Sequence, residues 1–137
     1  MEAGKNAVVT AVHALVKAVN GGDFDTAVAA FTAAPVIIED IAPYIWRGRN
    51  APSSWLSAMG ANAARLNVQS VLMTLEQPTR VELVDEAAYA VFPGRLNLVA
   101  GEANLVAEGM LTFTLQSTGG GWLIDSLVWS GPEPAPR

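Results

Sequence analysis

The sequence predicts an α+β fold in a single domain. Apolar residues recur at helical spacing in the first half of the chain, whereas alternating and continuous apolar runs typical of strands fill the part beyond residue 67. The chain has 137 residues, of which 51% are hydrophobic and 15% charged, so it can build one sizeable core but not two. This order of elements indicates helices packed on a long, curved, antiparallel sheet.

Three helices are expected before that boundary. The first covers residues 6–20, has valines at spacings of three and four, and stops at the Gly21–Gly22 pair. The second begins behind a capping Asp23 and is closed by Pro35. The third opens at residues 49–50. The stripes that the second and third helices would bury are Phe24, Ala27, Val28 and Phe31, and Trp55, Met59, Ala63 and Leu66.

One short strand pair, residues 36–46, interrupts the helices, and a meander of strands follows them. Gln-Pro, Asp-Glu, Pro-Gly, Ala-Gly and Gly-Gly-Gly sequences separate the apolar runs and are typical of turns. The predicted strands of the meander are residues 68–76, 80–84, 87–92, 96–99, 103–116 and 122–130. The domain would therefore end near residue 131, and residues 132–137, which are rich in proline, would form a flexible tail.

Charge and composition argue against several classes of function. A net charge of −5 and a pI near 4.7, with eight basic residues scattered singly, argue against a nucleic-acid partner and against binding to an anionic membrane. The N-terminal run is too short and too polar for a signal peptide or a membrane span, so a cytoplasmic location is expected. Zero cysteines and a single histidine leave no ligand set for a catalytic metal, and no cofactor is expected.

The most informative stretch is PVIIEDIAPYIWRGR, residues 35–49. An apolar strand ends there in two adjacent carboxylates, Glu39 and Asp40, before a turn that carries Tyr44 and Trp46. Partial desolvation at the end of a strand raises the pKa of a carboxyl group toward neutrality, which is how a general base is made. The alternative is that both acids are solvated, with Asp40 capping a local turn.

The last hairpin offers a second set of polar residues. If a loop at residues 117–120 closes it, Thr112 faces Asp125. The predicted polar side then consists of Glu108, Met110, Thr112, Thr114, Leu123, Asp125, Leu127 and Trp129. The opposite side consists of Leu111, Phe113, Leu115, Trp122, Ile124 and Val128. Either the polar side faces a cavity and brings Asp125 and Glu108 to the acid pair, or it is the wet face of the sheet.

Other candidates lie on the predicted helices and turn. His13 on the first helix would reach the pocket as a base or a hydrogen-bond donor, or else be a boundary residue. Tyr44 and Trp46 would either line the pocket or pack the turn on the third helix. Trp55 and Met59 would be core residues that also wall the cavity.

Three stretches, NGGDFDTAVAAF, IIEDIAPYIWRGR and LTFTLQSTGGGWLIDSLVWSG, resemble the nuclear transport factor 2-like superfamily. Its members include ketosteroid isomerase, scytalone dehydratase and SnoaL-type polyketide cyclases. The resemblance covers almost the whole chain and is closest to SnoaL-like proteins. It implies a cone-shaped fold in which three N-terminal helices pack on a strongly curved antiparallel sheet, with residues 1–131 as a single SnoaL-like domain. The superfamily hosts both enzymes and non-enzymatic binders, so the fold alone does not name a reaction.

The resemblance to ketosteroid isomerase implies roles for particular residues. The isomerase's base falls on Asp40 by residue identity and on Glu39 by a gap-free match, and only one of two adjacent strand residues can face the cone. Leu15 stands where the isomerase has its oxyanion-hole tyrosine. Thr112 stands where it has a protonated aspartate, and retains one donor. A pocket tryptophan of the isomerase is retained as Trp129.

These observations favour a cofactor-independent acid/base enzyme, such as an isomerase, cyclase, dehydratase or lyase, acting on a small apolar carbonyl, polyketide, steroid or aromatic molecule. Glu39 or Asp40 would abstract a proton. Asp125, Thr112 or Tyr44 would hold or protonate the developing oxyanion. The residues expected to contact the substrate are Trp46, Trp55, Met59, Glu108, Met110, Leu127 and Trp129.

Two non-catalytic alternatives are open. The chain would be a carrier or sensor of a small ligand, or a dimerisation module whose sheet is the interface. A homodimer is expected in any case, because it would hide Leu111, Phe113 and Val128 if these residues lie outside the core.

Overall fold

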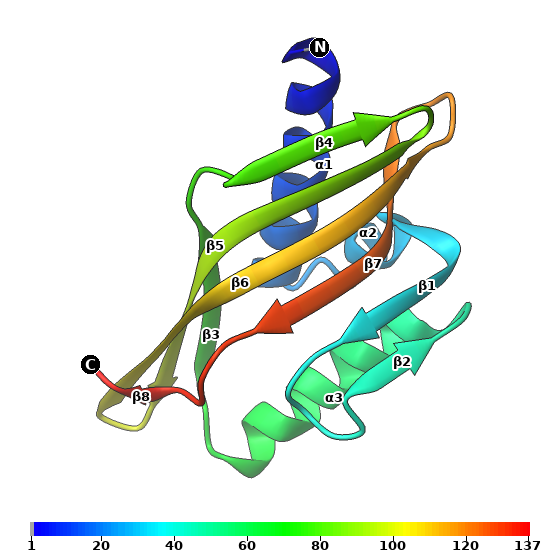
Figure 1. Ribbon diagram of the computed structural model, residues 1–137. Coiled ribbons are helices and arrows are strands. Elements are labelled where there is room, and N and C mark those ends of the chain that lie inside the picture. The colour runs from blue at the N-terminus through cyan, green and yellow to red at the C-terminus, as the bar shows by residue number, and fades with distance from the viewer. Residues whose placement is uncertain (1) are drawn as a thin grey trace.

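The computed structural model describes residues 2–137 and shows three helices packed on one face of a single curved sheet (Figure 1). The helices are α1 (Glu2–Asn20), α2 (Phe24–Ala29) and α3 (Ala51–Arg65). The strands are β1 (Phe31–Ile38), β2 (Ile45–Arg47), β3 (Ser70–Leu75), β4 (Arg80–Val84), β5 (Ala87–Ala100), β6 (Ala103–Ser117), β7 (Trp122–Ser130) and β8 (Ala135–Pro136). The α+β class predicted from the sequence is confirmed. No helix in the described range is long and apolar enough to cross a membrane.

The eight strands form one sheet in the order β2-β1-β7-β6-β5-β3, with β4 beside β5 and β8 beside β6. All these pairs are antiparallel except β1 and β7, which run parallel with Val36 opposite Ser126 and Ile38 opposite Val128. The sheet is therefore mixed, which corrects the purely antiparallel sheet expected from the sequence. Most of the chain lies between β1 and β7, so no tight turn ties their directions together.

A change of partner within β5 accompanies the curvature of the sheet. β5 is one long strand where the sequence predicts two, at residues 87–92 and 96–99. β4 pairs with its first part and β3 with its second, and the change falls at Pro93–Gly94. A Cβ on Gly94 would lie 3.1 Å from the Sδ atom of Met73, so glycine lets β3 approach this closely. The Pro-Gly pair thus lies inside a strand and is not a turn between two strands.

The core lies between the helices and the inner face of the sheet. α1 contributes Val8, Val12 and Leu15, which are almost completely buried and follow the spacing of an amphipathic helix. The largest almost completely buried side chains that the sheet contributes are Ile37, Phe92, Phe113, Leu115 and Ile124. Leu111 and Phe113 are core residues too, so a dimer is not needed to hide them.

Two boundaries differ from those predicted. α2 ends at Ala29, and Phe31 and Pro35 lie in β1, where the sequence predicts the end of a helix. The pairing of β1 with β7 shifts between Phe31 and Val36, and such an irregularity accommodates a proline, which cannot donate to the ladder. Within the predicted tail of residues 132–137, Ala135 and Pro136 form β8, which pairs with β6.

Trp129 of β7 packs against two glycines. A Cβ on Gly109 would collide with the backbone oxygen of Ser130 and lie 2.9 Å from the indole ring of Trp129, and a Cβ on Gly131 would lie 2.8 Å from the same ring. We expect Gly109→Ala to lower the free energy of unfolding by about 1–3 kcal/mol, because neither the backbone nor the buried ring can move without strain. Denaturant unfolding would measure this loss.

Gly60→Ala is the matched control. No atom lies within 4 Å of a Cβ built on Gly60, and Gly60 lies inside α3. Alanine is a better helix former than glycine, so we expect this substitution to raise the free energy of unfolding by up to about 1 kcal/mol. Similar losses in both variants would show that the close packing around Trp129 is not the cause.

Candidate functional site

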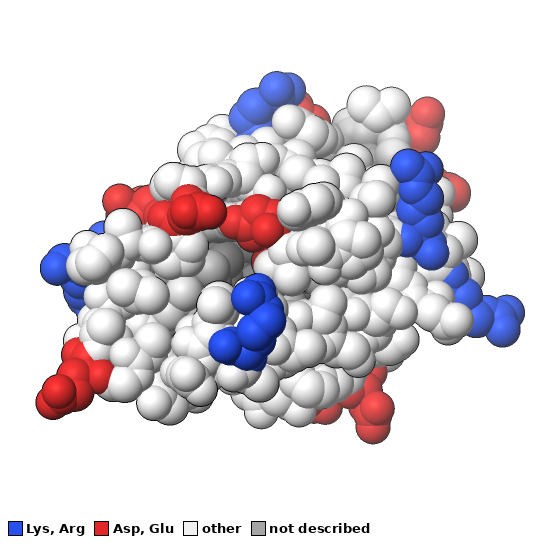
Figure 2. Space-filling view, turned by 90° about the horizontal axis from the view of Figure 1, so that it is seen from below, with Lys and Arg blue, Asp and Glu red and all other residues white. Residues whose placement is uncertain are grey.

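A cavity of about 1160 Å³ lies between the helices and the inner face of the sheet. Its lining is mainly apolar and comes from all three helices and from the sheet. Seen from below, the protein surface is hollowed, with acidic side chains along one edge of the hollow and a basic side chain beside the opposite edge (Figure 2). The walls include Leu15, Trp55, Met59, Leu111, Phe113, Leu127 and Trp129. A space of this size and lining suits a small apolar molecule.

Glu39 places its carboxyl group in this cavity. It follows the last residue of β1, and its Oε1 atom accepts a hydrogen bond from the indole Nε1 of Trp55 at 2.5 Å. Its backbone N–H donates to the carbonyl oxygen of Tyr44, and the N–H of Tyr44 donates to the carbonyl oxygen of Ile41. The turn after β1 therefore fixes the backbone of Glu39, and α3 fixes one oxygen of its side chain.

The pKa of Glu39 is raised from 4.5 to about 7. Burial is the main cause, because the carboxylate form loses water that the apolar walls do not replace. The hydrogen bond from Trp55 lowers the pKa, and the neighbouring charge of Asp40 raises it. Near neutral pH both the protonated and the ionised forms of Glu39 are populated, which is the condition for exchanging protons with a ligand.

Asp40 also borders the cavity but is exposed. Of the two adjacent acids, Glu39 is the one that burial and hydrogen bonding set apart. The sequence left both assignments open, and the gap-free match to the isomerase is the one that agrees with this geometry. The remaining acidic residues of the lining are Asp25 and Glu133.

The polar side predicted for the last hairpin does not share the cavity. Thr112 pairs with Val128 and Met110 with Ser130, not with Asp125 and Leu127, so the predicted register is wrong. The pairing shifts again between Thr114 and Leu115, and an irregularity inside the hairpin cannot be counted from its loop. The residues of this set that line the cavity are Leu127 and Trp129.

The displaced polar residues have partners elsewhere. Asp125 accepts a hydrogen bond from Thr32 Oγ1 at 2.7 Å. Glu108 forms an ion pair with Arg95 at 2.8 Å on an exposed part of the sheet. Thr112, Met110, Asp125 and Glu108 are therefore absent from the lining, and the expected cluster of carboxylates inside the cone is not formed.

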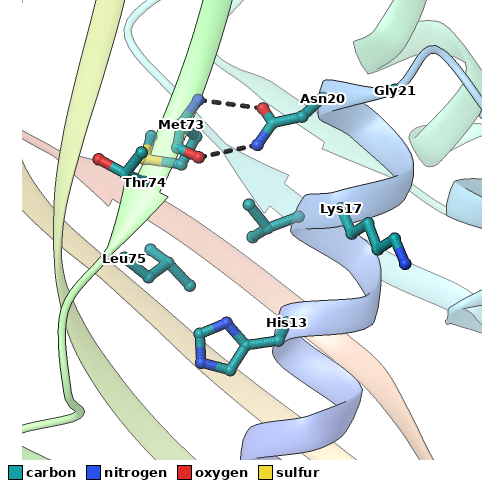
Figure 3. A pocket seen from close by; sticks show the side chains of 8 residues that line it. His13, Lys17, Asn20, Gly21, Met73, Thr74 and Leu75 are labelled. Carbon is teal, nitrogen blue, oxygen red and sulfur yellow. Dashed lines mark hydrogen bonds between the residues drawn. The ribbon is translucent and has the colours of Figure 1, made fainter.

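His13 lies in a separate groove of about 570 Å³ between α1 and β3 (Figure 3). The groove shares part of its wall with the large cavity, but neither His13 nor Lys17 borders that cavity. The imidazole ring instead meets Phe92 edge to face, with the ring centroids 6.0 Å apart. Asn20 closes the groove at one end, since its amide exchanges two hydrogen bonds with the backbone of Met73.

The two aromatic residues of the turn after β1 also lie outside the lining. Tyr44 is 59% exposed, and its backbone has a φ of 77°. Trp46 is buried opposite Ile37 and belongs to the core. Trp55 and Met59 of α3 border the cavity.

Sequence reasoning missed two features of the site. The sequence predicts Trp55 as a core and wall residue without a hydrogen-bond partner, although a buried indole N–H needs an acceptor, and a carboxylate 16 residues away satisfies it. Glu133 and Pro134 border the cavity from a segment that was taken for a tail. Within residues 2–137, no three His, Cys, Asp or Glu side chains lie close enough to hold a metal ion.

The fold agrees with several solved structures. A candidate scytalone dehydratase from Novosphingobium aromaticivorans superposes with a TM-score of 0.79 at 10% identity, covering 96% of this chain and 86% of its own. The hexachlorocyclohexane dehydrochlorinase LinA type 2 superposes with a TM-score of 0.76 at 14% sequence identity, and the match covers 100% of this chain and 93% of that protein. A nuclear transport factor 2-like protein from Salmonella enterica superposes with a TM-score of 0.76 at 17% sequence identity, and the match covers 96% of this chain and 92% of that protein. No protein-family model and no curated protein sequence matches the chain.

At these identities the comparison defines the fold. The chain has the cone-shaped nuclear transport factor 2-like fold, which confirms the fold implied by the sequence resemblance.

The raised pKa of Glu39 makes the stability of the protein depend on pH. The carboxyl pKa is about 7 in the fold and 4.5 as the reference for the unfolded chain, so Glu39 favours the fold below the lower value, and this contribution is lost as pH rises toward the higher one. Relative to Glu39→Gln, which cannot ionise, we expect the parent to lose up to about 3 kcal/mol of unfolding free energy between about pH 4.5 and about pH 8.

Urea unfolding of both proteins across this range would measure the difference. Using the difference cancels every other group that titrates, since Glu39→Gln keeps them all. A constant difference across the range would mean that the Glu39 carboxyl titrates normally in the fold.

Proposed function

We propose that the protein is a cofactor-independent enzyme that moves a proton on a small apolar molecule, with Glu39 as the general base. The observation that carries this proposal is a largely desolvated carboxyl group, with a pKa of about 7, that lines a mainly apolar cavity. Such a group can take a proton from carbon in its ionised form and return it in its protonated form.

The remaining polar groups of the lining narrow the reaction. Both ends of the Asn20 amide are occupied by Met73, and Ser53 donates to the carbonyl oxygen of Asn50 in its own helix. The hydroxyl group of Ser57 and the amide nitrogen of Asn62 are the lining donors left without a partner among the described residues, so few groups can hold a developing oxyanion. An elimination and a double-bond shift next to a carbonyl both begin with removal of the α proton, which is the step that requires the base. The names of two similar structures, a dehydratase and a dehydrochlorinase, denote eliminations and support the same class of step.

A non-catalytic carrier of a small apolar ligand is the second candidate. The same apolar walls favour it. The two candidates differ in one requirement: a carrier binds its ligand equally well without an ionisable group at residue 39.

Proton exchange at carbon tests the proposal without knowledge of the natural substrate. In heavy water, the parent protein would replace the protons next to the carbonyl of an apolar ketone with deuterium, and NMR would follow the loss of signal. With β-tetralone and progesterone as probes, we expect Glu39→Gln to slow this exchange by about 10²- to 10⁴-fold, because glutamine keeps the shape but cannot accept the proton.

Asp40→Asn is the matched control. It changes the adjacent acid but leaves Glu39 in place, so exchange should persist, with its pH profile moved to lower pH because Asp40 raises the pKa of Glu39. Binding of the neutral fluorophore Nile red would verify that each variant keeps its cavity. Exchange no faster than in buffer, with Nile red still bound, would contradict the enzyme and favour the carrier.

We further propose that the outer face of the sheet pairs two copies of this chain. Ile45, Ile38, Val128, Thr112 and Val91 form one row across five strands on that face. Ile38 is 39% exposed and Ile45 36%, so the row offers apolar area that a second copy would cover.

Val128→Lys places a charge in the middle of this row, and we expect it to convert the dimer to a monomer because the lysine would be buried without a partner. Val84→Lys is the control, since Val84 is 70% exposed on β4 and lies outside the row. Light scattering at micromolar concentration would measure both. A parent protein that is already monomeric would contradict the interface.

A further inference from the structure

Trp55 is the residue that holds the carboxyl group of Glu39. Its indole ring is buried, with 5% of its surface exposed, and it meets Phe31 at the start of β1 edge to face, with ring centroids 6.2 Å apart. An indole has one donor and no acceptor, and here the donor is spent on Oε1 of Glu39. The ring therefore has one orientation that satisfies both its packing and its hydrogen bond.

The second oxygen of Glu39 is left free by this arrangement. Oε2 makes no hydrogen bond within residues 2–137, yet no buried side-chain oxygen or nitrogen of these residues lacks a partner. Oε2 therefore keeps access to the cavity that Glu39 borders. Trp55 thus holds Oε1 of Glu39, and Oε2 is free to contact a ligand in the cavity.

The charged residues around the cavity are acidic, so the ionised form of Glu39 depends on its hydrogen bond from Trp55. The acids of the lining besides Glu39 are Asp25, Asp40 and Glu133, and the lining contains no lysine, arginine or histidine. Arg65 stands beside it but donates to Asn62 Oδ1. Among the described residues, the indole N–H is the single side-chain donor on the Glu39 carboxylate, so it opposes both burial and the neighbouring negative charge.

We propose that Trp55 is a positioning residue that stabilises the ionised form of Glu39 through Oε1 and aims Oε2 at the ligand. In its catalytic aspect this rests on the proposed function, because it gives the base its orientation and its proton affinity. The pairing itself is a property of the folded protein and requires no substrate.

Trp55→Phe tests the pairing, since phenylalanine keeps an apolar ring and removes the donor. Trp129→Phe is the matched control for the titration, because Trp129 is also buried in the cavity wall but makes no hydrogen bond among the described residues. NMR of isotope-labelled protein would follow the side-chain carbonyl signal of Glu39, assigned by its disappearance in Glu39→Gln. We expect the Glu39 pKa to rise further in Trp55→Phe and to stay at the parent value in Trp129→Phe.

Ketone exchange adds the catalytic readout. In Trp55→Phe we expect kcat at neutral pH to fall about tenfold, with KM changed by less than about twofold, since phenylalanine keeps an apolar ring in the cavity wall and the lost hydrogen bond is to the base. Part of the loss should persist at high pH, where Glu39 is ionised in both proteins. Full recovery at high pH would reject the aiming of Oε2 and leave only an effect on proton affinity.

The parent protein supplies a test that does not depend on the folding of a variant. The indole N–H signal of Trp55 should shift with the ionisation of Glu39 and should be independent of pH in Glu39→Gln. Either of two results overturns the proposal: a Glu39 pKa that is unchanged in folded Trp55→Phe, or a Trp55 indole N–H signal that does not shift when Glu39 ionises.

These outcomes separate the pairing from the enzyme. If the two groups titrate together but no ketone is exchanged, the proposed function fails and the pairing stands. If exchange requires Glu39 but is indifferent to Trp55→Phe, the pairing fails and the proposed function stands.

Discussion

The desolvation of one carboxyl group is the constraint on which the site depends. Glu39 stands at the end of a buried strand, where the chain must turn and its side chain enters an apolar space. Burying a carboxylate there is unfavourable in free energy, and two features of the fold reduce this penalty. The protonated form is populated alongside the ionised form near neutral pH, and the ionised form accepts a hydrogen bond from an indole N–H. Together, burial and the indole hydrogen bond set the pKa of Glu39 near neutral pH, where the group can exchange a proton with a ligand.

The shape of the sheet decides how much room surrounds that carboxyl group. β5 pairs with β4 at one end and with β3 at the other, and the change at Pro93–Gly94 lets the sheet curve around the helices. In β6 and after β7, Gly109 and Gly131 leave space for the ring of Trp129 to lie close to the backbone. Small residues therefore act at a distance from Glu39, because they set the positions of the walls that keep water from it.

Several features could be predicted from the sequence because they depend on local patterns. The helical spacing of α1, the strands β4 and β7, and the apolar approach to Glu39 were all visible in neighbouring residues. The register of the last hairpin was not: its loop is residues 118–121 and not 117–120, and an irregularity between Thr114 and Leu115 shifts the pairing further, so that Thr112 pairs with Val128 and not with Asp125. The parallel pairing of β1 with β7 and the docking of β8 were missed for a related reason. They join segments far apart in the chain, and no local signal encodes such a contact.

A ligand bound in the cavity would contact Glu39 and would also raise the proton affinity of its carboxyl group. The free oxygen of Glu39 retains contact with the cavity, and an apolar molecule that fills the space would replace the water remaining there. Loss of that water favours the protonated form further, whereas the bond from Trp55 is fixed by the packing of α3 on β1 and does not weaken. The carboxylate would then be held in place while its pKa rises, so under the proposed function the binding of the ligand would itself increase the basicity of Glu39.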